Sequence, residues 1–146
     1  MPASPFSVTL CAWDDARPDA RRIREQVFVR EQGVPLELEW DDHDVHCDHA
    51  LAYSDDGVAI GTGRLLPDGH IGRMAVLSEW RGKGVGALLL LALVEQARMR
   101  GHTAAHLNAQ IHAAGFYRRY GFEVEGPEFM EAGIPHVAMQ RDLTCS

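Results

Sequence analysis

The stretch RMAVLSEWRGKGVGALLLLALVEQARMRG, residues 73–101, decides the fold and the chemistry that we expect from this chain. It holds three glycines at alternate positions between an apolar segment and a leucine-rich helix: Gly82, Gly84 and Gly86. The first N–H groups of a helix have no partner inside the helix, and the helix dipole adds positive charge there. Glycines remove Cβ atoms and permit left-handed dihedrals, so a large anion can approach the backbone. With Arg81 and Lys83 beside the glycines, the stretch predicts a phosphate-binding turn.

Two common phosphate-binding motifs do not fit this turn. A Walker loop needs a glycine five residues before its Gly-Lys pair and a hydroxyl residue after it, whereas Leu77 and Gly84 hold those positions here. A dinucleotide-binding turn needs the spacing G-x-G-x-x-G, and the spacing in this chain is G-x-G-x-G. The turn therefore belongs to another class of phosphate site.

The rest of the composition limits the class of protein. A chain of 146 residues predicts a single domain, residues 1–146, with a sizeable core. The net charge of −7 argues against a nucleic-acid partner. The longest apolar run is about half of the ~20 residues that span a bilayer, and the N-terminus does not resemble a signal peptide. Three cysteines without paired spacing are typical of free thiols in a reducing cytosol, so we expect a soluble cytoplasmic protein.

The residue pattern predicts an α/β fold with a mixed, mostly antiparallel central sheet of about seven strands flanked by helices. We expect strands at residues 6–13, 49–54, 57–67, 69–78, 103–110, 122–126 and 134–143. We expect helices at residues 14–33, 84–100 and 112–121, and a loop at 34–48. Asp14 or Asp15 is the expected cap of the first helix.

Residues 81–86, RGKGVG, resemble the acyl-CoA-binding motif of the GNAT superfamily of acetyl-CoA-dependent N-acyltransferases. That motif is Arg or Gln, two variable residues, Gly, one variable residue, and Gly or Ala. The stretch NAQIHAAGFYRRYGF, residues 108–122, resembles the second signature of the superfamily, and residues 28–44 and 133–139 resemble its ElaA-like branch. The resemblance implies transfer of the acetyl group of acetyl-CoA to an amine by direct attack in a ternary complex. The co-substrate would enter a V-shaped opening between the fourth and fifth strands.

The resemblance also implies roles for residues on the acetyl-CoA side. The residues that it assigns to co-substrate binding are Met74, Ala75, Val76, Arg81, Gly82, Lys83, Gly84, Val85, Gly86, Asn108 and Phe116. Tyr117 matches the tyrosine that protonates the departing thiolate, and the alternative is an aromatic ring packed against the co-substrate. For Asn108 the alternative is a turn or helix cap.

The acceptor side is predicted from charge. Residues 31–63 contain nine acids and neither lysine nor arginine, and such a field attracts an ammonium group. The acceptor must lose a proton before it attacks, so a carboxylate or imidazole is needed as a base. The candidate bases are Glu31, Glu39, His49 and His136. The alternative is a solvated acidic loop without a catalytic role.

Two other functions stay open at this point. The first is a non-catalytic domain that binds or senses acyl-CoA. The second is a metal module built from His43, His46, Cys47 and His49, but no second ligand cluster completes the spacing of a zinc site, so we expect no metal. The expected partner is a small-molecule or peptide amine. Homodimers are common in the superfamily that the chain resembles, so a homodimer is also open.

Overall fold

The computed structural model describes residues 6–36 and 42–144. The strands are β1 (Phe6–Cys11), β2 (Asp48–Ser54), β3 (Ala59–Leu65), β4 (His70–Val76), β5 (Ala104–Gln110), β6 (Glu123–Glu131) and β7 (Ile134–Asp142). The α-helices are α1 (Trp13–Arg24), α3 (Val85–Met99) and α4 (Ala114–Arg119). A π-helix, η1 (Glu25–Glu31), continues α1, and three short 3₁₀ turns complete the set: η2 (Asp44–His46), η3 (Ser78–Trp80) and η4 (Ile111–Ala113). This order confirms the predicted succession of strands and helices.

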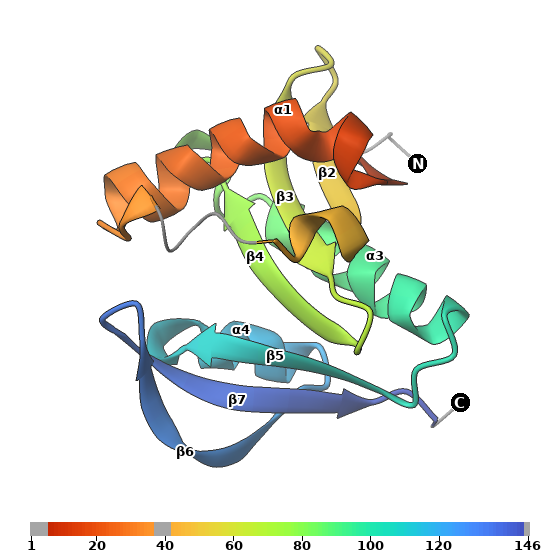
Figure 1. Ribbon diagram of the computed structural model, residues 1–146, viewed down its shortest axis with the longest axis vertical. Coiled ribbons are helices and arrows are strands. Elements are labelled where there is room, and N and C mark those ends of the chain that lie inside the picture. The colour runs from red at the N-terminus through yellow and green to blue at the C-terminus, as the bar shows by residue number, and fades with distance from the viewer. Residues whose placement is uncertain (1–5, 37–41, 145–146) are drawn as a thin grey trace.

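The seven strands form one mixed sheet in the order β1-β2-β3-β4-β5-β7-β6. Every neighbouring pair is antiparallel except β4 and β5, which are parallel. Within the described chain, β4 and β5 pair at two positions, His70 with His106 and Ile71 with Leu107, and then diverge (Figure 1). The predicted fold class and the predicted opening between the fourth and fifth strands are confirmed.

A β-bulge in β4 lies where this opening starts. The register with β3 shifts there, so that Arg73 and Met74 together face the single residue Gly63. Arg73 takes a left-handed backbone conformation with φ 51°, and bulges turn a strand away from its partner. A Cβ at Gly63 would lie 2.8 Å from Cδ1 of Leu93 and 3.0 Å from Cγ of Met74, so glycine lets helix α3 pack this closely on β3 opposite the bulge.

The first helix is shorter and wider than the sequence predicts. Helix α1 begins at Trp13 after Ala12, so neither Asp14 nor Asp15 is its cap; both lie in the first turn, where a negative charge favours the helix dipole. From Glu25 the helix continues as a π-helix rather than as the α-helix expected over residues 14–33. A π-helical segment is uncommon and is often found at a functional site.

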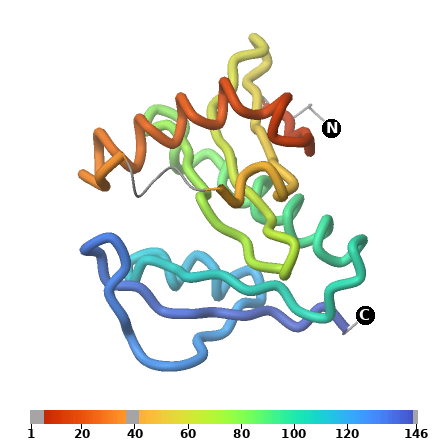
Figure 2. The backbone as a smooth tube through the Cα atoms, in the orientation of Figure 1, coloured from red at the N-terminus to blue at the C-terminus, as the bar shows by residue number. Residues whose placement is uncertain are grey.

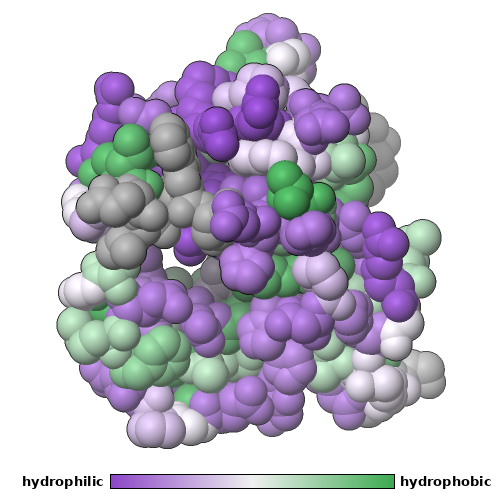
Figure 3. All heavy atoms as spheres, in the orientation of Figure 1, coloured by the Kyte–Doolittle hydropathy of each residue, from purple (hydrophilic) through white to green (hydrophobic). Residues whose placement is uncertain are grey.

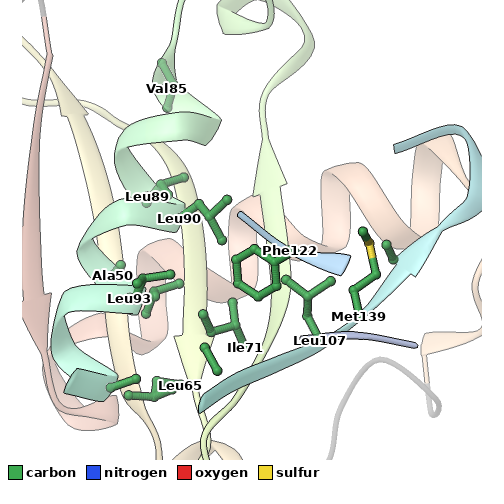
Figure 4. Packing of buried hydrophobic residues seen from close by; sticks show 14 of the residues in the cluster. Ala50, Leu65, Ile71, Val85, Leu89, Leu90, Leu93, Leu107, Phe122 and Met139 are labelled. Atoms are coloured by element: carbon green, nitrogen blue, oxygen red, sulfur yellow. The ribbon is translucent and has the colours of Figure 1, made fainter. Parts of the chain in front are cut away.

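The helices cover both faces of the sheet (Figure 1). Helix α3 packs through Leu89, Leu90 and Leu93, which are fully buried, and these residues meet Ile71 of β4 and Phe122, which follows α4 (Figure 4). Helix α1 covers the other face through Ile23 and further apolar residues. In the described part of the chain, no helix is long and apolar enough to cross a membrane.

The opening divides the chain into two arms. Residues from β1 to β4 build one arm, and β5, α4, β6 and β7 build the other (Figure 2). One hydrogen bond joins the arms at the mouth of the opening, where the Gln110 amide of β5 donates to the side chain of Gln32, which follows η1 (3.0 Å). The opening is thus bordered by β4 and β5, and Gln32 spans one side of it.

Candidate active site

The glycine turn precedes α3 and takes backbone conformations that favour glycine. Gly82 has φ 76°, and Gly84 has φ 92° and is the residue before the helix. Leu88 donates its amide to the carbonyl of Gly84 (3.2 Å) and starts the helical hydrogen-bond pattern. Among the described residues, no acceptor binds the amides of residues 82–87, and the turn is exposed. The predicted row of available donors is therefore present at the start of α3.

Gly86 lies between the two arms. A Cβ on Gly86 would lie 3.7 Å from Cζ of Phe116 on α4 and 3.9 Å from Cγ2 of Val76 on β4. These are ordinary van der Waals distances, so alanine would fit there without moving a neighbour. The first turn of α3 therefore lies beside β4 and α4, where the strands have separated.

Arg81 holds the turn to the first arm. Its Nε donates to the carbonyl of Val76 (2.9 Å), and its Nη2 forms an ion pair with Glu31 at the end of η1 (2.9 Å). Lys83 lies over the ring of Trp80, with Nζ 5.6 Å from the ring centre. Arg81 is thus engaged by protein groups, and it positions the turn in addition to giving it positive charge.

The end of β4 offers backbone groups to the opening. Met74, Ala75 and Val76 lie beyond the last residue pair between β4 and β5, while β3 pairs with the other edge of the strand. The side chain of Ala75 is buried against the α1 side, and Met74 lines the opening. In this segment β5 does not pair with the edge that faces it, and the carbonyl of Val76 accepts the hydrogen bond from Arg81.

A cavity of about 690 Å³ occupies the opening. Its walls come from η1 and the loop after it, from β3 and β4, from β5, from the segment 113–117 and from the β6–β7 hairpin. Figure 3 shows a hollow between the upper and lower parts of this face, bordered mainly by hydrophilic residues. Because both the α1 side and the α4 side contribute walls, the cavity reaches through the sheet between β4 and β5.

Tyr117 lines this cavity from α4. Its ring packs edge-on against the rings of Phe116 and Phe122, with distances between ring centres of 5.1 Å and 6.1 Å. Burial raises the pKa of Tyr117 to about 12, so the hydroxyl keeps its proton at neutral pH. The side chain is therefore in the protonation state that a proton donor needs.

His136 lines the opposite wall from β7. Its Nδ1 donates a hydrogen bond to the carbonyl of Ile134 (2.7 Å), because a carbonyl can only accept. The neutral ring then carries its lone pair on Nε2, which lies 3.4 Å from a carboxylate oxygen of Glu131. The ring also stacks on Phe129 at 6.0 Å. These contacts fix the tautomer and orientation of an imidazole that can accept a proton.

Asn108 also lines the cavity, and it lies within β5 rather than at the end of the strand. Its side-chain amide donates a hydrogen bond to the carboxylate of Glu131, the last residue of β6 (3.5 Å). Glu131 thus links the two polar side chains of this wall, Asn108 and His136. The sequence analysis did not identify Glu131, because its position opposite both residues depends on the register of β7 with β5 and β6.

Two of the other candidate bases, Glu31 and His49, do not line the cavity. Glu39 lies outside the described residues. Glu31 does not line the cavity and pairs with Arg81. His49 is almost fully buried, its Nε2 donates to the carbonyl of Asp44 (2.8 Å), and burial lowers its pKa. Because His49 has no path to the cavity, we assign it a structural role against Trp13 and leave it out of the chemistry.

Only part of the acidic span at residues 31–63 can be placed, because Glu37, Glu39 and Asp41 lie outside the described residues. Among its described members, none lines the cavity. Asp44 is buried between two arginines, and Asp48 binds Arg100. Asp42 lies in an exposed turn just before η2, and Asp55 and Asp56 lie in the turn between β2 and β3. Among the described residues, the charged ones that line the cavity, apart from its histidines, are Arg64, Asp68, Arg73 and Glu131.

The histidine and cysteine cluster at 43–49 is also dispersed. Cys47 donates to the carbonyl of His43 (3.2 Å), and His49 bonds to the carbonyl of Asp44 (2.8 Å). In residues 6–36 and 42–144, no group of three or more His, Cys, Asp or Glu side chains is arranged to hold a metal ion.

Comparison with known proteins agrees with this geometry. Residues 26–143 match the family model of the acetyltransferase (GNAT) domain. The uncharacterized N-acetyltransferase YjcF of Bacillus subtilis is 40% identical over 128 residues, which is 85% of this chain and 91% of that protein. An acyl-CoA N-acyltransferase from Pseudomonas aeruginosa has a similar structure, with a TM-score of 0.83, 32% identity, and coverage of 93% of this chain and 99% of that one. Escherichia coli ElaA has a TM-score of 0.83 and 25% identity, with coverage of 94% and 99%.

The chain therefore belongs to the GNAT acetyltransferase family, in the branch that includes ElaA, and it is an acyltransferase. An acyl-CoA is the co-substrate of this family. The residues of the glycine turn fit such a ligand, because they present a row of amides and an exposed surface without Cβ atoms.

Proposed function

We propose that this protein transfers the acetyl group of acetyl-CoA to an amine by direct attack in a ternary complex. One observation supports the proposal above the others. The amides of residues 82–87, which no described residue engages, lie beside an opening that also contains a protonated tyrosine and the imidazole of His136, whose Nδ1 donates to a backbone carbonyl. A diphosphate group, a thioester and an amine each have a complementary group there.

On the co-substrate side, the turn at Gly82–Gly86 would bind the diphosphate through backbone amides and the positive end of α3. The free edge of β4 at Met74–Val76 would bind the amide-rich arm of acetyl-CoA, as an additional strand does at a sheet edge. A backbone amide of this edge would stabilise negative charge on the thioester oxygen. Asn108 and Phe116 would complete the walls beside the arm.

On the acceptor side, Nε2 of His136 would take a proton from the ammonium group of the acceptor. The carboxylate of Glu131 at 3.4 Å stabilises the imidazolium that results. The amine nitrogen then forms a bond to the carbonyl carbon, and the carbon–sulfur bond breaks. The overall reaction consumes an ammonium and a thioester and yields an amide, a thiol and one proton.

The leaving thiolate would take its proton from Tyr117. The reaction needs this proton only moderately, since a thiol has a reference pKa of ~8.5 and its thiolate is a fair leaving group. A phenol with a pKa of about 12 holds its proton until the sulfur carries charge. Direct attack also agrees with the cavity walls, because no cysteine, serine or threonine is found among the described residues that line them.

The test is release of free thiol from acetyl-CoA in the presence of a panel of amines. We expect amine-dependent release by the native protein and a fall of about 10²-fold or more for His136→Gln. His46→Gln is the matched control, since His46 is exposed and does not line the cavity. Binding of acetyl-CoA without release by any amine would favour the alternative, a non-catalytic domain that senses acyl-CoA.

A further inference from the structure

Strand β4 contains a glycine, Gly72, that neither packing nor backbone conformation requires. In β3, a Cβ on Gly61 would lie 2.9 Å from Cδ1 of Leu89. A Cβ on Gly63 would lie 2.8 Å from Cδ1 of Leu93, so the packing of α3 favours glycine at both positions. At Gly72, in contrast, no atom of the described residues lies within 4 Å of such a Cβ, and φ is not left-handed. Glycine weakens the interior of a strand, and it often marks a site where a ligand approaches the backbone closely.

The register of the sheet places Gly72 on the floor of the cavity. Ile71 and Leu107 pair across β4 and β5 and point into the core on the α3 side (Figure 4). Side chains alternate along a strand, so Gly72 and Asn108 face the α1 side. Both residues line the cavity, and each directly follows the last residue pair between β4 and β5. The missing side chain therefore leaves space on the α1 side, where the opening begins.

The proposed base lies on the same face of the sheet. His136 pairs with Gln110 of β5, two residues after Asn108, and paired residues of neighbouring strands share a face. Strands β4 and β7 lie on either side of β5, and adjacent strands are about 4.8 Å apart, which places Gly72 roughly 10 Å or more from His136. An amine that reacts beside His136 would thus extend across β5 toward Gly72.

The surroundings of this space suit a hydrocarbon group. Phe28 of η1 and Val34, which follows η1, line the same cavity. Arg64 of β3 pairs with Gly72 and shares its face, but its guanidinium group reaches to Asp44 of η2 (2.8 Å) and leaves the position beside Gly72 open. The cavity of about 690 Å³ is the size of a site for a small molecule. The open backbone at Gly72 widens it at one point.

We propose that Gly72 determines the specificity for the acceptor, and that the space beside it holds a hydrocarbon ring of the acceptor amine. The inference rests on the proposed acetyl transfer, because His136 marks the position of the reacting nitrogen. A ring needs the width that the missing side chain gives, whereas a straight chain also fits a narrower groove. A side chain at position 72 would therefore exclude ring-bearing amines first and leave the co-substrate in place.

The experiment compares amines that differ only in width. Phenylalkylamines of increasing linker length are each paired with the straight-chain amine of the same carbon number, and thiol release from acetyl-CoA is measured for every pair. We expect kcat/KM of the native protein to favour the ring by at least about tenfold at the best linker length. Gly72→Leu should remove this preference, with a loss of about threefold or less for the straight chain, and Gly72→Ala should have a smaller effect.

Ala138→Val is the control. Ala138 pairs with Asn108 and so faces the same side of the sheet, but it does not line the cavity. The variant adds bulk two strands away from Gly72 and should keep the preference for the ring.

Three further measurements test the inference without turnover. Calorimetric titration should give the native affinity for acetyl-CoA in every variant. The Tm of Gly72→Ala should be no lower than that of the native protein, because the added methyl group meets no atom of the described chain. The N-acetyl phenylalkylamines, which are the products of the panel, should bind to the native protein saturated with CoA and should not bind to Gly72→Leu.

The outcomes separate the two proposals. Equal turnover of both members of every pair, or a ring preference that survives Gly72→Leu, overturns the specificity inference and leaves acetyl transfer standing. A lower Tm of Gly72→Ala, or a loss of acetyl-CoA affinity in Gly72→Leu, also overturns it, because position 72 then serves the fold or the co-substrate. Gly72-dependent binding of the ring-bearing products, without thiol release from any amine, overturns acetyl transfer and keeps the space at Gly72.

Discussion

Replacing Gly84 by alanine tests the turn on which the proposed function depends. Gly84 has φ 92°, a conformation that L-residues reach only at a cost of roughly 1–2 kcal/mol. A Cβ at this position would lie 3.9 Å from Cζ of Phe6, an ordinary contact, so crowding adds nothing to the backbone strain. The whole effect should therefore come from the left-handed conformation.

The strain must be visible in one of two quantities. If the substituted turn keeps its conformation without ligand, the free energy of unfolding falls by about 1–2 kcal/mol, and Tm falls by about 2–8 °C for a chain of this size. If the turn relaxes without ligand, CoA must restore it, and the affinity for CoA falls by a factor of about 5–30. The prediction concerns a sum: the loss in free energy of unfolding plus the loss in free energy of CoA binding should be close to the strain energy.

Gly86→Ala is the matched control. Gly86 has helical dihedrals, and its added Cβ meets Val76 and Phe116 at ordinary distances. Alanine stabilises a helix relative to glycine by roughly 0.5–1 kcal/mol, so Tm should rise slightly and CoA should still bind. Thermal unfolding and calorimetric titration with CoA measure both variants. The reasoning is refuted if Gly84→Ala loses neither stability nor affinity, or if Gly86→Ala loses as much affinity as Gly84→Ala.

Two further predictions follow from the pKa values. Tyr117→Phe should lower kcat by about tenfold to a hundredfold with little change in acetyl-CoA affinity, and the loss should be constant from pH 7 to pH 10, because burial raises the pKa of Tyr117 to about 12. A loss that disappears within this range in a pH–rate profile would exclude Tyr117 as the proton donor. Burial alone would raise the pKa of Asp44, but the hydrogen bonds and charges of Arg24 and Arg64 outweigh burial and hold it below its ordinary value of 3.8. The ion pairs therefore stabilise the fold above that pH and are lost as the pH falls through the lowered pKa, so Asp44→Asn should flatten the acid side of the stability curve and cost about 3–5 kcal/mol at pH 7, measured by denaturant unfolding. An unchanged acid slope would contradict this assignment.

The glycine turn could be predicted from the sequence because its physics is local. Available amides, left-handed glycines and a following helix occur within ten residues, and the structure has all three. The succession of strands and helices along the chain was also predictable, since apolar periodicity and turn residues mark each element. The π-helix at Glu25–Glu31 was not, because its apolar spacing is close to that of an α-helix.

The acceptor wall required knowledge of tertiary structure. The sequence shows an acidic span at residues 31–63, but its buried member Asp44 is used to hold Arg24 and Arg64. The described acids that do line the cavity, Asp68 and Glu131, lie in other segments of the chain. His136 was one of four candidate bases, and only the register of the last hairpin shows that Glu131 lies beside it.

The bulge at Arg73 and Met74 shows that β4 cannot both pair fully with its neighbours and leave a passage for substrates. Deleting one of these residues would restore an even register with β3 and bring the end of β4 back alongside β5. Such a shortened chain would gain sheet hydrogen bonds and would have no passage for either substrate. The irregular strand thus gives up sheet hydrogen bonds and keeps the passage between β4 and β5.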